Sequence, residues 1–428
     1  MMQDTKRCYD FETVVSHSHM GNMKDSATPE AIRQQGIVSF GGAEMDFATA
    51  PSVIEAITRR AQNGLLGYTI MDDSYLKPIV WWMRHIRSVD ILPEWIVPAL
   101  GTIYSVATAI RLFCRPGEEI VTMTPVYYRY EQAATRLGRK TLHCPLIEKE
   151  GVYSIDFENL EQLMARPSCR LLVLCNPHNP VGRVWSRSEL TAIARLSDKY
   201  EVPVFSDEIF AEITFDGHET IPYISIEEGK KWAITATSLG KTFNFTGVNQ
   251  ANIIIPDDRL REAFIRQRTA DHFGSIDPLF HAAIGGAYCE EGADWVRELR
   301  RHLAGCRKLL YEVFEPAVPG KSSLASAPWA SGSAVGRISP VEGTFVAWIR
   351  WNLSDAKGRE LFGDALTEFL QQEILLDLEP GLEYGSDCQR YTRMNFATTT
   401  DQLKAAVARI RRCEDRLEGL TDERRREG

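Results

Sequence analysis

Lys241 is placed in the sequence where a lysine can do covalent chemistry. It lies in the segment Ser238 to Thr242, directly after the apolar run Ala233 to Thr237. Partial burial at the end of such a run lowers the pKa of a lysine and frees the lone pair of its amine, which can then form an imine with a carbonyl group. A surface lysine at the end of a strand is the alternative, so the neighbouring motifs must decide between the two.

Asp207 is the second candidate, and it lies 34 residues before Lys241, just after the apolar run Val202 to Phe205. The cofactor pyridoxal 5'-phosphate (PLP) requires a carboxylate beside its pyridine nitrogen, because a protonated ring withdraws electrons from the substrate Cα. Aspartate also caps helices and turns, which is the simpler alternative. The spacing of one strand and one helix favours a shared site with Lys241.

Polar motifs follow several apolar runs that we expect to be strands. The runs are Glu119 to Met123, Leu171 to Cys175, Val202 to Phe205, Ala233 to Thr237 and Ala251 to Ile255. Helical segments separate them, and the runs lack alternation, which is typical of a mostly parallel sheet covered on both faces. The motifs Thr124-Pro125, Asn176-Pro177, Ser206-Asp207 and Ser238 to Lys241 follow four of these runs, so we expect them to meet at the carboxyl ends of the strands.

The length of 428 residues favours one large and one smaller domain. We predict an N-terminal arm over residues 1–47 that joins the small domain, a large α/β domain over 48–300, and a small α+β domain over 301–428. In the small domain, strands are expected over Thr344 to Trp351 and Tyr391 to Phe396, with a helix over Gly358 to Glu373. The segment Gly320 to Gly336 is rich in Gly, Ser, Ala and Pro and predicts an exposed loop or insertion.

Composition excludes several classes of protein. The formal charge of −9 leaves no broad basic surface, so no nucleic acid partner is expected. No apolar run approaches the roughly eighteen residues of a membrane span. The nine cysteines are scattered, without a C-x-x-C motif, which favours reduced thiols over disulfides or a metal site. Because Met1 to Phe11 also lacks the apolar stretch of a secretory signal, we expect a cytoplasmic protein.

Three motifs in order resemble the fold type I PLP-dependent enzymes, the class I/II aminotransferase superfamily. They are Cys175 to Arg183 (CNPHNPVGR), Ser206 to Ile209 (SDEI) and Ser238 to Gly247. The Asn-Pro-His-Asn-Pro-x-Gly-Arg form is similar to the MalY/PatB branch of cystathionine β-lyase-like carbon–sulfur lyases. The resemblance implies a large domain with a mostly parallel, seven-stranded type of sheet between helices, a smaller α+β domain, and PLP held as a Schiff base on Lys241.

The resemblance also implies roles for residues that would hold the cofactor. Asn179 would donate to the phenolic oxygen of PLP and help to hold the substrate carboxylate, and Tyr127 would stack on the pyridine face. Tyr128 and Tyr130 we assign to the core or the rim. The phosphate would lie against Gly101, Thr102, Ile103 and Ser238. A glycine before a helix brings backbone amides close to an anion, although Gly-Thr is also a common way to begin a helix.

Further residues would bind the amino-acid substrate or the neighbouring subunit. Arg393 matches the arginine that grips the substrate α-carboxylate, unless it is a surface or salt-bridged residue. Gly42, in the arm, falls where the family backbone faces the substrate. Tyr68 matches the tyrosine that family members lend to the phosphate of a neighbouring subunit, which implies a homodimer, and a half-buried turn residue is the alternative.

Several positions depart from the family pattern and leave the substrate open. Phe210 stands where relatives usually have Tyr or His near the phenolic oxygen of PLP, which would leave Asn179 as the main donor there and shift the pKa of the cofactor imine. Gly240 replaces a residue that is often Ser, and Asn249 stands where many aminotransferases have a phosphate-binding arginine. The arm has Gly41-Gly42 where the lyases usually have a bulkier, Trp-containing stretch.

The expected reaction is cleavage of a cysteine S-conjugate or a cystathionine-like thioether to thiol, pyruvate and ammonia. The alternative is an aminotransferase that acts on an amino acid and a 2-keto acid. Pyruvate release without a keto-acid acceptor discriminates between the two. A binding or regulatory protein that uses PLP only structurally is a third hypothesis, and the joint presence of Lys241, Asp207, Asn179 and Arg393 argues against it.

Overall fold

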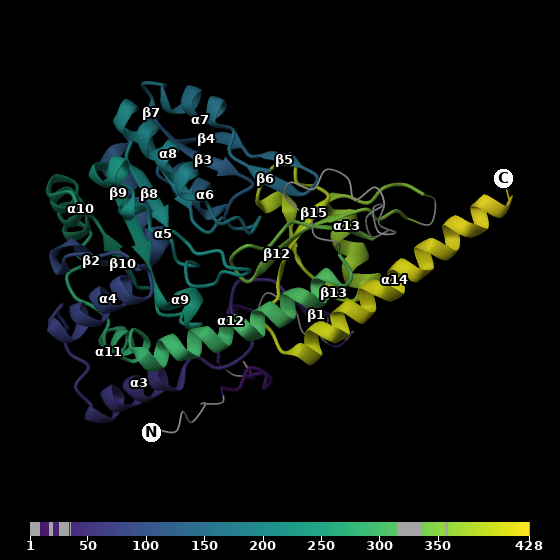
Figure 1. The fold of residues 1–428 in the computed structure, drawn as a ribbon, viewed down its shortest axis with the longest axis horizontal. Coiled ribbons are helices and arrows are strands. Elements are labelled where there is room, and N and C mark those ends of the chain that lie inside the picture. The colour runs from purple at the N-terminus through teal and green to yellow at the C-terminus, as the bar shows by residue number, and fades with distance from the viewer. Residues whose placement is uncertain are drawn as a thin grey trace.

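A computed structural model of the chain describes residues 9–16, 20–24, 34, 36–314, 335–355 and 358–427, with side chains described up to residue 413. Two sheets organise the described residues, a seven-stranded one and a four-stranded one (Figure 1). Most of the Gly-rich segment 320–336, over residues 320–334, lies outside the described residues.

The larger sheet has the strand order β2-β10-β9-β8-β7-β3-β4. Its strands are β2 Ile96–Ala99, β3 Glu119–Thr124, β4 Lys140–Pro145, β7 Cys169–Cys175, β8 Val204–Asp207, β9 Ala233–Thr237 and β10 Ala251–Ile254. Strand β10 is antiparallel to both of its neighbours, and the pairs among β4, β3, β7, β8 and β9 are parallel. The predicted mostly parallel, seven-stranded sheet is therefore confirmed.

Helices cover both faces of this sheet, as its buried strands require. In β7, Leu171 and Val173 belong to a core shared with α5 and α6, while Leu172 and Leu174 point to the opposite face and a second core that includes α8. The helices of this part are α3 Pro51–Asn63, α4 Asp73–His85, α5 Gly101–Phe113, α6 Arg129–Arg136, α7 Phe157–Met164, α8 Arg187–Tyr200, α9 Leu239–Thr242, α10 Asp258–Ala270 and α11 Pro278–Ala287. Short 3₁₀ turns are η1 Pro93–Trp95, η2 Tyr223–Ser225 and η3 Glu227–Trp232, and a hairpin is formed by β5 Ile147–Lys149 and β6 Val152–Ser154.

Local sequence explains where several helices begin. Ser186 and Glu189 form a capping box at the start of α8, in which each side chain satisfies a backbone amide of the first turn. Asp72 caps α4 and Asp277 caps α11, and in each case the aspartate side chain accepts hydrogen bonds from backbone amides of the first turn. These signals are local, because each cap lies within a few residues of the helix that it begins.

The four-stranded antiparallel sheet, β11-β12-β15-β14, carries the C-terminal part of the chain. Its elements are β11 Gly336–Ile338, β12 Val346–Trp351, β14 Glu379–Pro380 and β15 Tyr391–Asn395, with α13 Gly363–Phe369, η4 Leu370–Ile374, η5 Gly381–Glu383 and α14 Thr400–Glu427 around them. Strand β1 Val38–Ser39 of the arm pairs with β13 Leu376–Asp377. The predicted helix over 358–373 is shorter at its start, because α13 begins at Gly363.

One long helix, α12 Glu290–Tyr311, runs from the part with the larger sheet to the part with the smaller one (Figure 1). The predicted boundary between residues 300 and 301 lies inside this helix, and the division into domains stays a prediction. None of the helices within the described residues combines the length and the apolarity that a membrane crossing requires.

Candidate active site

Lys241 lies in α9, just after β9, and is half-buried. Its Nζ donates a hydrogen bond of 2.9 Å to the carbonyl oxygen of Ala43 in the N-terminal arm. Burial lowers the pKa of Lys241 to about 8, and the positive charge of Arg393 acts in the same direction. The amine is therefore close to losing its proton near neutral pH, which is the state that can form an imine.

Asp207 ends the neighbouring strand β8, and its carboxylate is buried. Its Oδ2 accepts from the hydroxyl of Tyr130 at 2.5 Å, and its Oδ1 accepts from the amide of Ile209 at 3.3 Å. Burial raises the pKa of Asp207 to about 6, while the hydrogen bond from Tyr130 opposes the rise. Tyr130 is a core residue, as expected, but its hydroxyl contact with Asp207 was missed, because position in the sequence gives no sign of a partner 77 residues away.

Arg393 lies in β15 and is only 3% exposed. One terminal nitrogen, NH1, donates to Oδ1 of Asn179 at 3.1 Å, and NH2 lies 2.5 Å from Oε2 of Glu379. Its Nε is buried and has no hydrogen-bond partner among the described residues. The structure thus brings together Asn179 and Arg393, two residues predicted to hold the substrate carboxylate. It adds Glu379, which the sequence analysis missed.

Strand pairing explains why Glu379 meets Arg393. The two residues are direct partners in the antiparallel pair β14–β15, so their side chains lie on the same face. Glu379 also accepts from the amide of Gly42 at 2.7 Å and from the hydroxyl of Tyr384. Gly42 has a φ of +69°, a conformation that favours glycine. The carboxylate of Glu379 therefore links Gly42, the predicted arm residue, to Arg393, and no sequence motif indicated this carboxylate.

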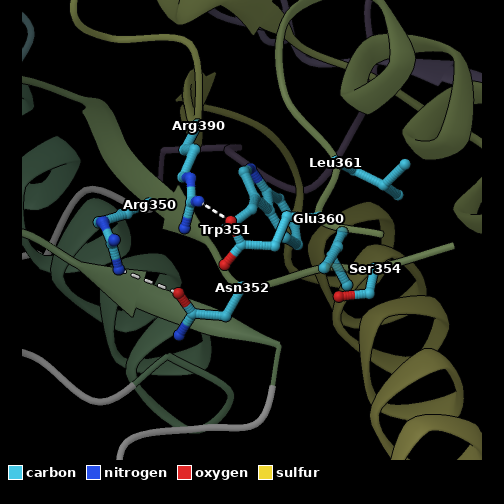
Figure 2. Close-up of a pocket in the computed structure, with 8 residues that line it drawn as sticks. Arg350, Trp351, Asn352, Ser354, Glu360, Leu361 and Arg390 are labelled. Carbon is cyan, nitrogen blue, oxygen red and sulfur yellow. Dashed lines mark hydrogen bonds and ion pairs between the residues drawn. The ribbon is translucent and has the colours of Figure 1, made fainter. Parts of the chain in front are cut away.

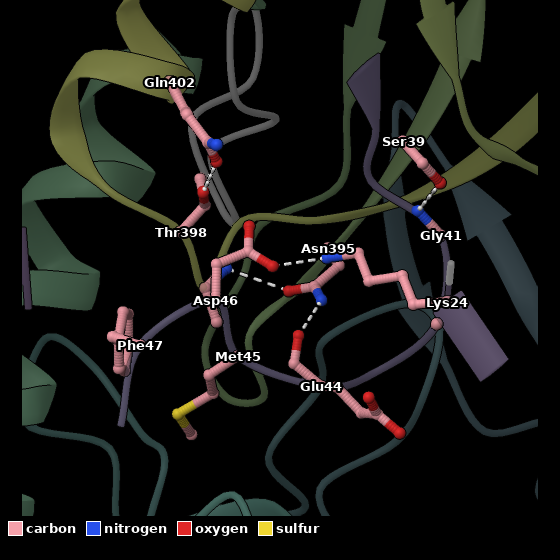
Figure 3. A network of polar contacts seen from close by, with 12 residues as sticks. Lys24, Ser39, Gly41, Glu44, Met45, Asp46, Phe47, Asn395, Thr398 and Gln402 are labelled. Atoms are coloured by element: carbon pink, nitrogen blue, oxygen red, sulfur yellow. Dashed lines mark hydrogen bonds and ion pairs between the residues drawn. The ribbon is translucent and has the colours of Figure 1, made fainter. Parts of the chain in front are cut away.

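The N-terminal arm is fixed at this site by polar contacts with distant parts of the chain. Figure 3 shows Asn395 donating to the carbonyl oxygen of Glu44, at 2.6 Å, and Lys24 paired with Asp46, at 2.5 Å. Asn244, three residues after Lys241, binds the amide and the carbonyl oxygen of Met45 at 2.9 and 3.0 Å. These contacts hold the carbonyl of Ala43 against the lysine.

The predicted phosphate-binding residues lie at the starts of two helices. Gly101 begins α5 with a φ of +74°, and no side chain caps that helix at Leu100. No side chain therefore caps the first backbone amides of α5, in the turn that contains Thr102 and Ile103. Ser238 precedes α9, and its hydroxyl donates to the carbonyl oxygen of Gln250 at 2.9 Å.

Two aromatic residues flank the lysine and the aspartate. Phe210 is buried, with its ring centroid 5.8 Å from Nζ of Lys241 and 5.1 Å from the ring centroid of Phe345. Tyr127 is half-buried, its ring lies edge-on to that of Tyr130 at 5.7 Å, and burial raises its pKa to about 12. The structure therefore places Phe210 next to the lysine, and its ring carries no group that could donate a hydrogen bond.

Tyr68, another predicted site residue, lies on the surface of the chain. Its side chain is fully exposed, at 100%. It borders a surface hollow of about 480 Å³ that is lined by Leu66, Gly67, Tyr68, Phe273, Ser275, Ile276, Asp277 and Pro278. The alternative of a half-buried turn residue is therefore wrong for the single chain.

A second hollow, of about 330 Å³, lies in the part with the smaller sheet (Figure 2). It is lined by Arg350, Trp351, Asn352, Leu353, Ser354, Glu360, Leu361 and Arg390. Arg390 pairs with Glu360, and Arg350 donates to Asn352 at 3.0 Å. None of its lining residues belongs to the cluster around Lys241, so we assign it no part in the chemistry.

A family model for aminotransferases of class I and II matches residues 35–410. The chain belongs to this family. It is 30% identical over 377 residues to cystathionine β-lyase PatB of Bacillus subtilis (strain 168), covering 86% of this chain and 90% of the relative. It is 27% identical over 404 residues to the protein MalY of Escherichia coli (strain K12), covering 94% and 97%. The predicted resemblance to the MalY/PatB branch is therefore confirmed.

Among solved structures, cystalysin from Treponema denticola superimposes with a TM-score of 0.85, 28% identity, and coverage of 97% of this chain and all of that chain. The cystalysin structure contains a pyridoxal 5'-phosphate cofactor. Fold type I, predicted from the motifs, is thus confirmed for this member of the family.

The residues of the site fit PLP. An aldehyde requires an amine of lowered pKa, and Lys241 provides one. A pyridine nitrogen requires a carboxylate, and Asp207 provides one. Asp207 is buried at the end of β8, which pairs with β9, the strand before Lys241. A phosphate requires donors, and the uncapped start of α5 provides them.

Proposed function

We propose that this chain binds PLP through Lys241 and cleaves the Cβ–S bond of cysteine S-conjugates or cystathionine-like thioethers, releasing thiol, pyruvate and ammonia. The observation that carries the proposal is the half-buried amine of Lys241, with its lowered pKa, in one site with the buried carboxylate of Asp207 and the buried guanidinium of Arg393. The names of the relatives PatB and cystathionine β-lyase support the lyase over other reactions of the family.

PLP, when bound, supplies an aldehyde that links to amines and a ring that accepts electrons from the substrate Cα. Asp207 would hold a proton on the ring nitrogen, and Tyr130 would keep the aspartate in place through its hydrogen bond of 2.5 Å. Tyr127 would pack on the ring face. The start of α5, at Gly101, would hold the phosphate.

Arg393 would bind the α-carboxylate of the amino acid, using the Nε that lacks a partner. Asn179, bound to the same guanidinium at 3.1 Å, would fix its orientation. With the carboxylate held, Lys241 would remove the proton from Cα, because its pKa is lowered to about 8 and its amine is largely available near neutral pH. Loss of that proton allows the thiolate at Cβ to leave, and water then releases pyruvate and ammonia.

The test uses the purified protein loaded with PLP. With cystathionine or another cysteine thioether and no keto acid, we expect equal amounts of pyruvate and thiol, and an absorbance band that borohydride removes by fixing the cofactor to Lys241. A Lys241→Ala variant should lose both. Absence of pyruvate with every thioether tested would overturn the lyase.

An aminotransferase is the second candidate, because the family model that matches the chain is that of class I and II aminotransferases. In that case Lys241 would return its proton to the cofactor, and the amino group would pass to a 2-keto acid. The same assay decides, because pyruvate would then form only with alanine and a keto-acid acceptor. A binding protein with PLP as a structural group would retain its biological effect in the Lys241→Ala variant.

We also propose that the active unit is a homodimer in which Tyr68 reaches the phosphate of the other subunit. Tyr68 is fully exposed, and Leu65, Leu66 and Ile70 beside it are 72%, 55% and 72% exposed. Such a run of apolar side chains in water marks an association surface. Sedimentation should give twice the chain mass, and Tyr68→Phe should weaken PLP binding without dissociating the dimer. A monomer with full PLP affinity would contradict this.

A cytoplasmic location is part of the same proposal. The described cysteines are all free, and most of them are buried. Cell fractionation of a tagged full-length chain tests it, and recovery of the protein in an extracellular fraction would contradict it.

A further inference from the structure

Glu379 places a negative charge directly beside the proposed carboxylate-binding arginine. Its Oε2 lies 2.5 Å from NH2 of Arg393, whose guanidinium also lies over the ring of Tyr384 at 5.2 Å from its centroid. The other oxygen, Oε1, accepts from the amide of Gly42. Glu379 is therefore held on three sides, and the charge of Arg393 is already balanced before a substrate arrives.

Two further carboxylates lie near the same space. The negative charge of Glu44, like that of Glu379, opposes the fall in the pKa of Lys241. Burial raises the pKa of Glu383, the charge of Glu379 adds to this rise, and the charge of Arg393 opposes it. Three carboxylates, those of Glu379, Glu44 and Glu383, therefore act on Lys241 or on one another here, and Arg129 joins Arg393 in acting on Glu383.

A substrate α-carboxylate bound to Nε of Arg393 adds one more negative charge to a guanidinium that is already paired. The sulfur of a bound cysteine thioether is only two bonds from Cα, so its side chain would extend from a point close to the pair of Arg393 and Glu379. A cationic group at the far end of the thioether would relieve the excess negative charge, and an anionic group would add to it.

We propose that Glu379 is a specificity-determining residue, and that it selects cysteine thioethers whose leaving group carries an ammonium over those whose leaving group carries only a carboxylate. This inference rests on the proposed lyase function. A unit charge roughly 8 Å from Glu379, at an effective dielectric constant of about 20, changes an equilibrium by roughly thirtyfold, and the pairing of Glu379 with Arg393 reduces this effect. Removal of the charge of Glu379 is therefore expected to change the preference between the two thioethers by about tenfold.

The experiment compares S-(2-aminoethyl)-L-cysteine with S-carboxymethyl-L-cysteine on the PLP-loaded enzyme. Both share the α-carboxylate, the α-amine and the Cβ–S bond, so effects on Arg393 cancel in the ratio of their kcat/KM values. The Glu379→Gln variant keeps an acceptor for Gly42 but removes the charge, and its ratio should fall by about tenfold relative to wild type. Comparison of the two enzymes also cancels the difference between the two leaving groups.

Two controls keep the test decisive. Glu360→Gln removes a charge from the second hollow, where Glu360 pairs with Arg390, and should leave the ratio unchanged. If Glu379→Gln does not fold, Glu383→Gln should lower the ratio in the same direction by a smaller factor. Calorimetric affinities of both thioethers for the loaded enzyme should give the same order of preference whether or not elimination follows.

The outcomes separate the two proposals. No pyruvate from either thioether or from cystathionine would overturn the proposed function, and the calorimetric ratio would still decide on Glu379. Pyruvate from both thioethers, with the same ratio in wild type and Glu379→Gln, would overturn the specificity role and leave the lyase intact. A ratio that rises in Glu379→Gln would also overturn it.

Discussion

Replacement of Arg87 by methionine should destabilise the protein strongly, because it leaves two carboxylates buried without their cation. Arg87 follows helix α4, and its side chain is 3% exposed. Its NH2 lies 2.5 Å from Glu208, which is fully buried, and its NH1 lies 3.6 Å from Glu212. Glu208 directly follows Asp207, so the ion pair lies next to the proposed cofactor site.

The magnitude follows from what remains after the change. Removing one partner of a buried ion pair costs about 3 to 5 kcal/mol. Glu208 keeps the amide of Tyr223 at 2.7 Å and the hydroxyl of Ser206 at 2.9 Å, which reduces the loss. We therefore expect the free energy of unfolding to fall by about 3 kcal/mol, at the lower end of that range.

The pH dependence of the loss has a definite sign. Burial raises the pKa of Glu208, and Arg87 opposes that rise. Without Arg87 the pKa of Glu208 in the folded state rises further, so the folded variant binds a proton that the unfolded chain has released. The variant then gains stability relative to wild type as the pH falls toward the ordinary range for glutamate.

Urea unfolding of the protein, followed by tryptophan fluorescence, measures the change. Arg84→Met is the matched control, since Arg84 lies three residues away and pairs with Asp90 at 2.5 Å, but both side chains are largely exposed, at 59% and 75%. Exposed pairs contribute about 1 kcal/mol or less. If Arg87→Met cost no more than Arg84→Met, the reasoning that the buried pair holds this region together would be refuted.

Two further predictions concern packing and acid stability. Gly286→Ala would place a Cβ 2.4 Å from the carbonyl oxygen of Ser52, where α11 packs on α3, and should cost about 1 to 3 kcal/mol in urea unfolding. Gly285→Ala meets nothing within 4 Å and should be neutral or stabilising by up to about 1 kcal/mol, so equal losses in both variants would contradict the contact. Burial lowers the pKa of His178 to about 4, so the unfolded chain takes up a proton on acidification before the folded one does. Compared with His178→Gln, wild type should lose about 2 to 3 kcal/mol between about pH 7 and about pH 4.5, and parallel pH profiles would exclude a neutral, buried histidine.

The sequence by itself determined the parts of the site that follow strands. Lys241, Asp207 and Asn179 each come directly after an apolar run, and the carboxyl ends of neighbouring parallel strands lie at one edge of a sheet. The order and spacing of these residues along the chain were enough to predict that they lie at one edge of the sheet, because strand and helix signals are local. For the same reason five of the seven strands of the large sheet were predicted close to their observed bounds, whereas β2 and β4 were not predicted.

The start of α13 was less well placed, since a helix boundary depends on packing as well as on local preference. The direction of β10 could not be read from its apolar run either, because a buried strand has the same composition whether it runs parallel or antiparallel to its neighbours.

Only the tertiary structure decided which side chains surround the reactive groups. Glu379 reaches Arg393 through the register of two antiparallel strands, and Tyr130 reaches Asp207 across 77 residues of sequence. The carbonyl oxygen of Ala43 reaches Lys241 across 198 residues. Contacts of this kind arise from packing between distant segments, and so do the lowered pKa of Lys241 and the raised pKa of Asp207, because burial is the main cause of both. The motifs indicated the groups that we propose to do the chemistry, and the tertiary structure determined their burial and their hydrogen-bond partners.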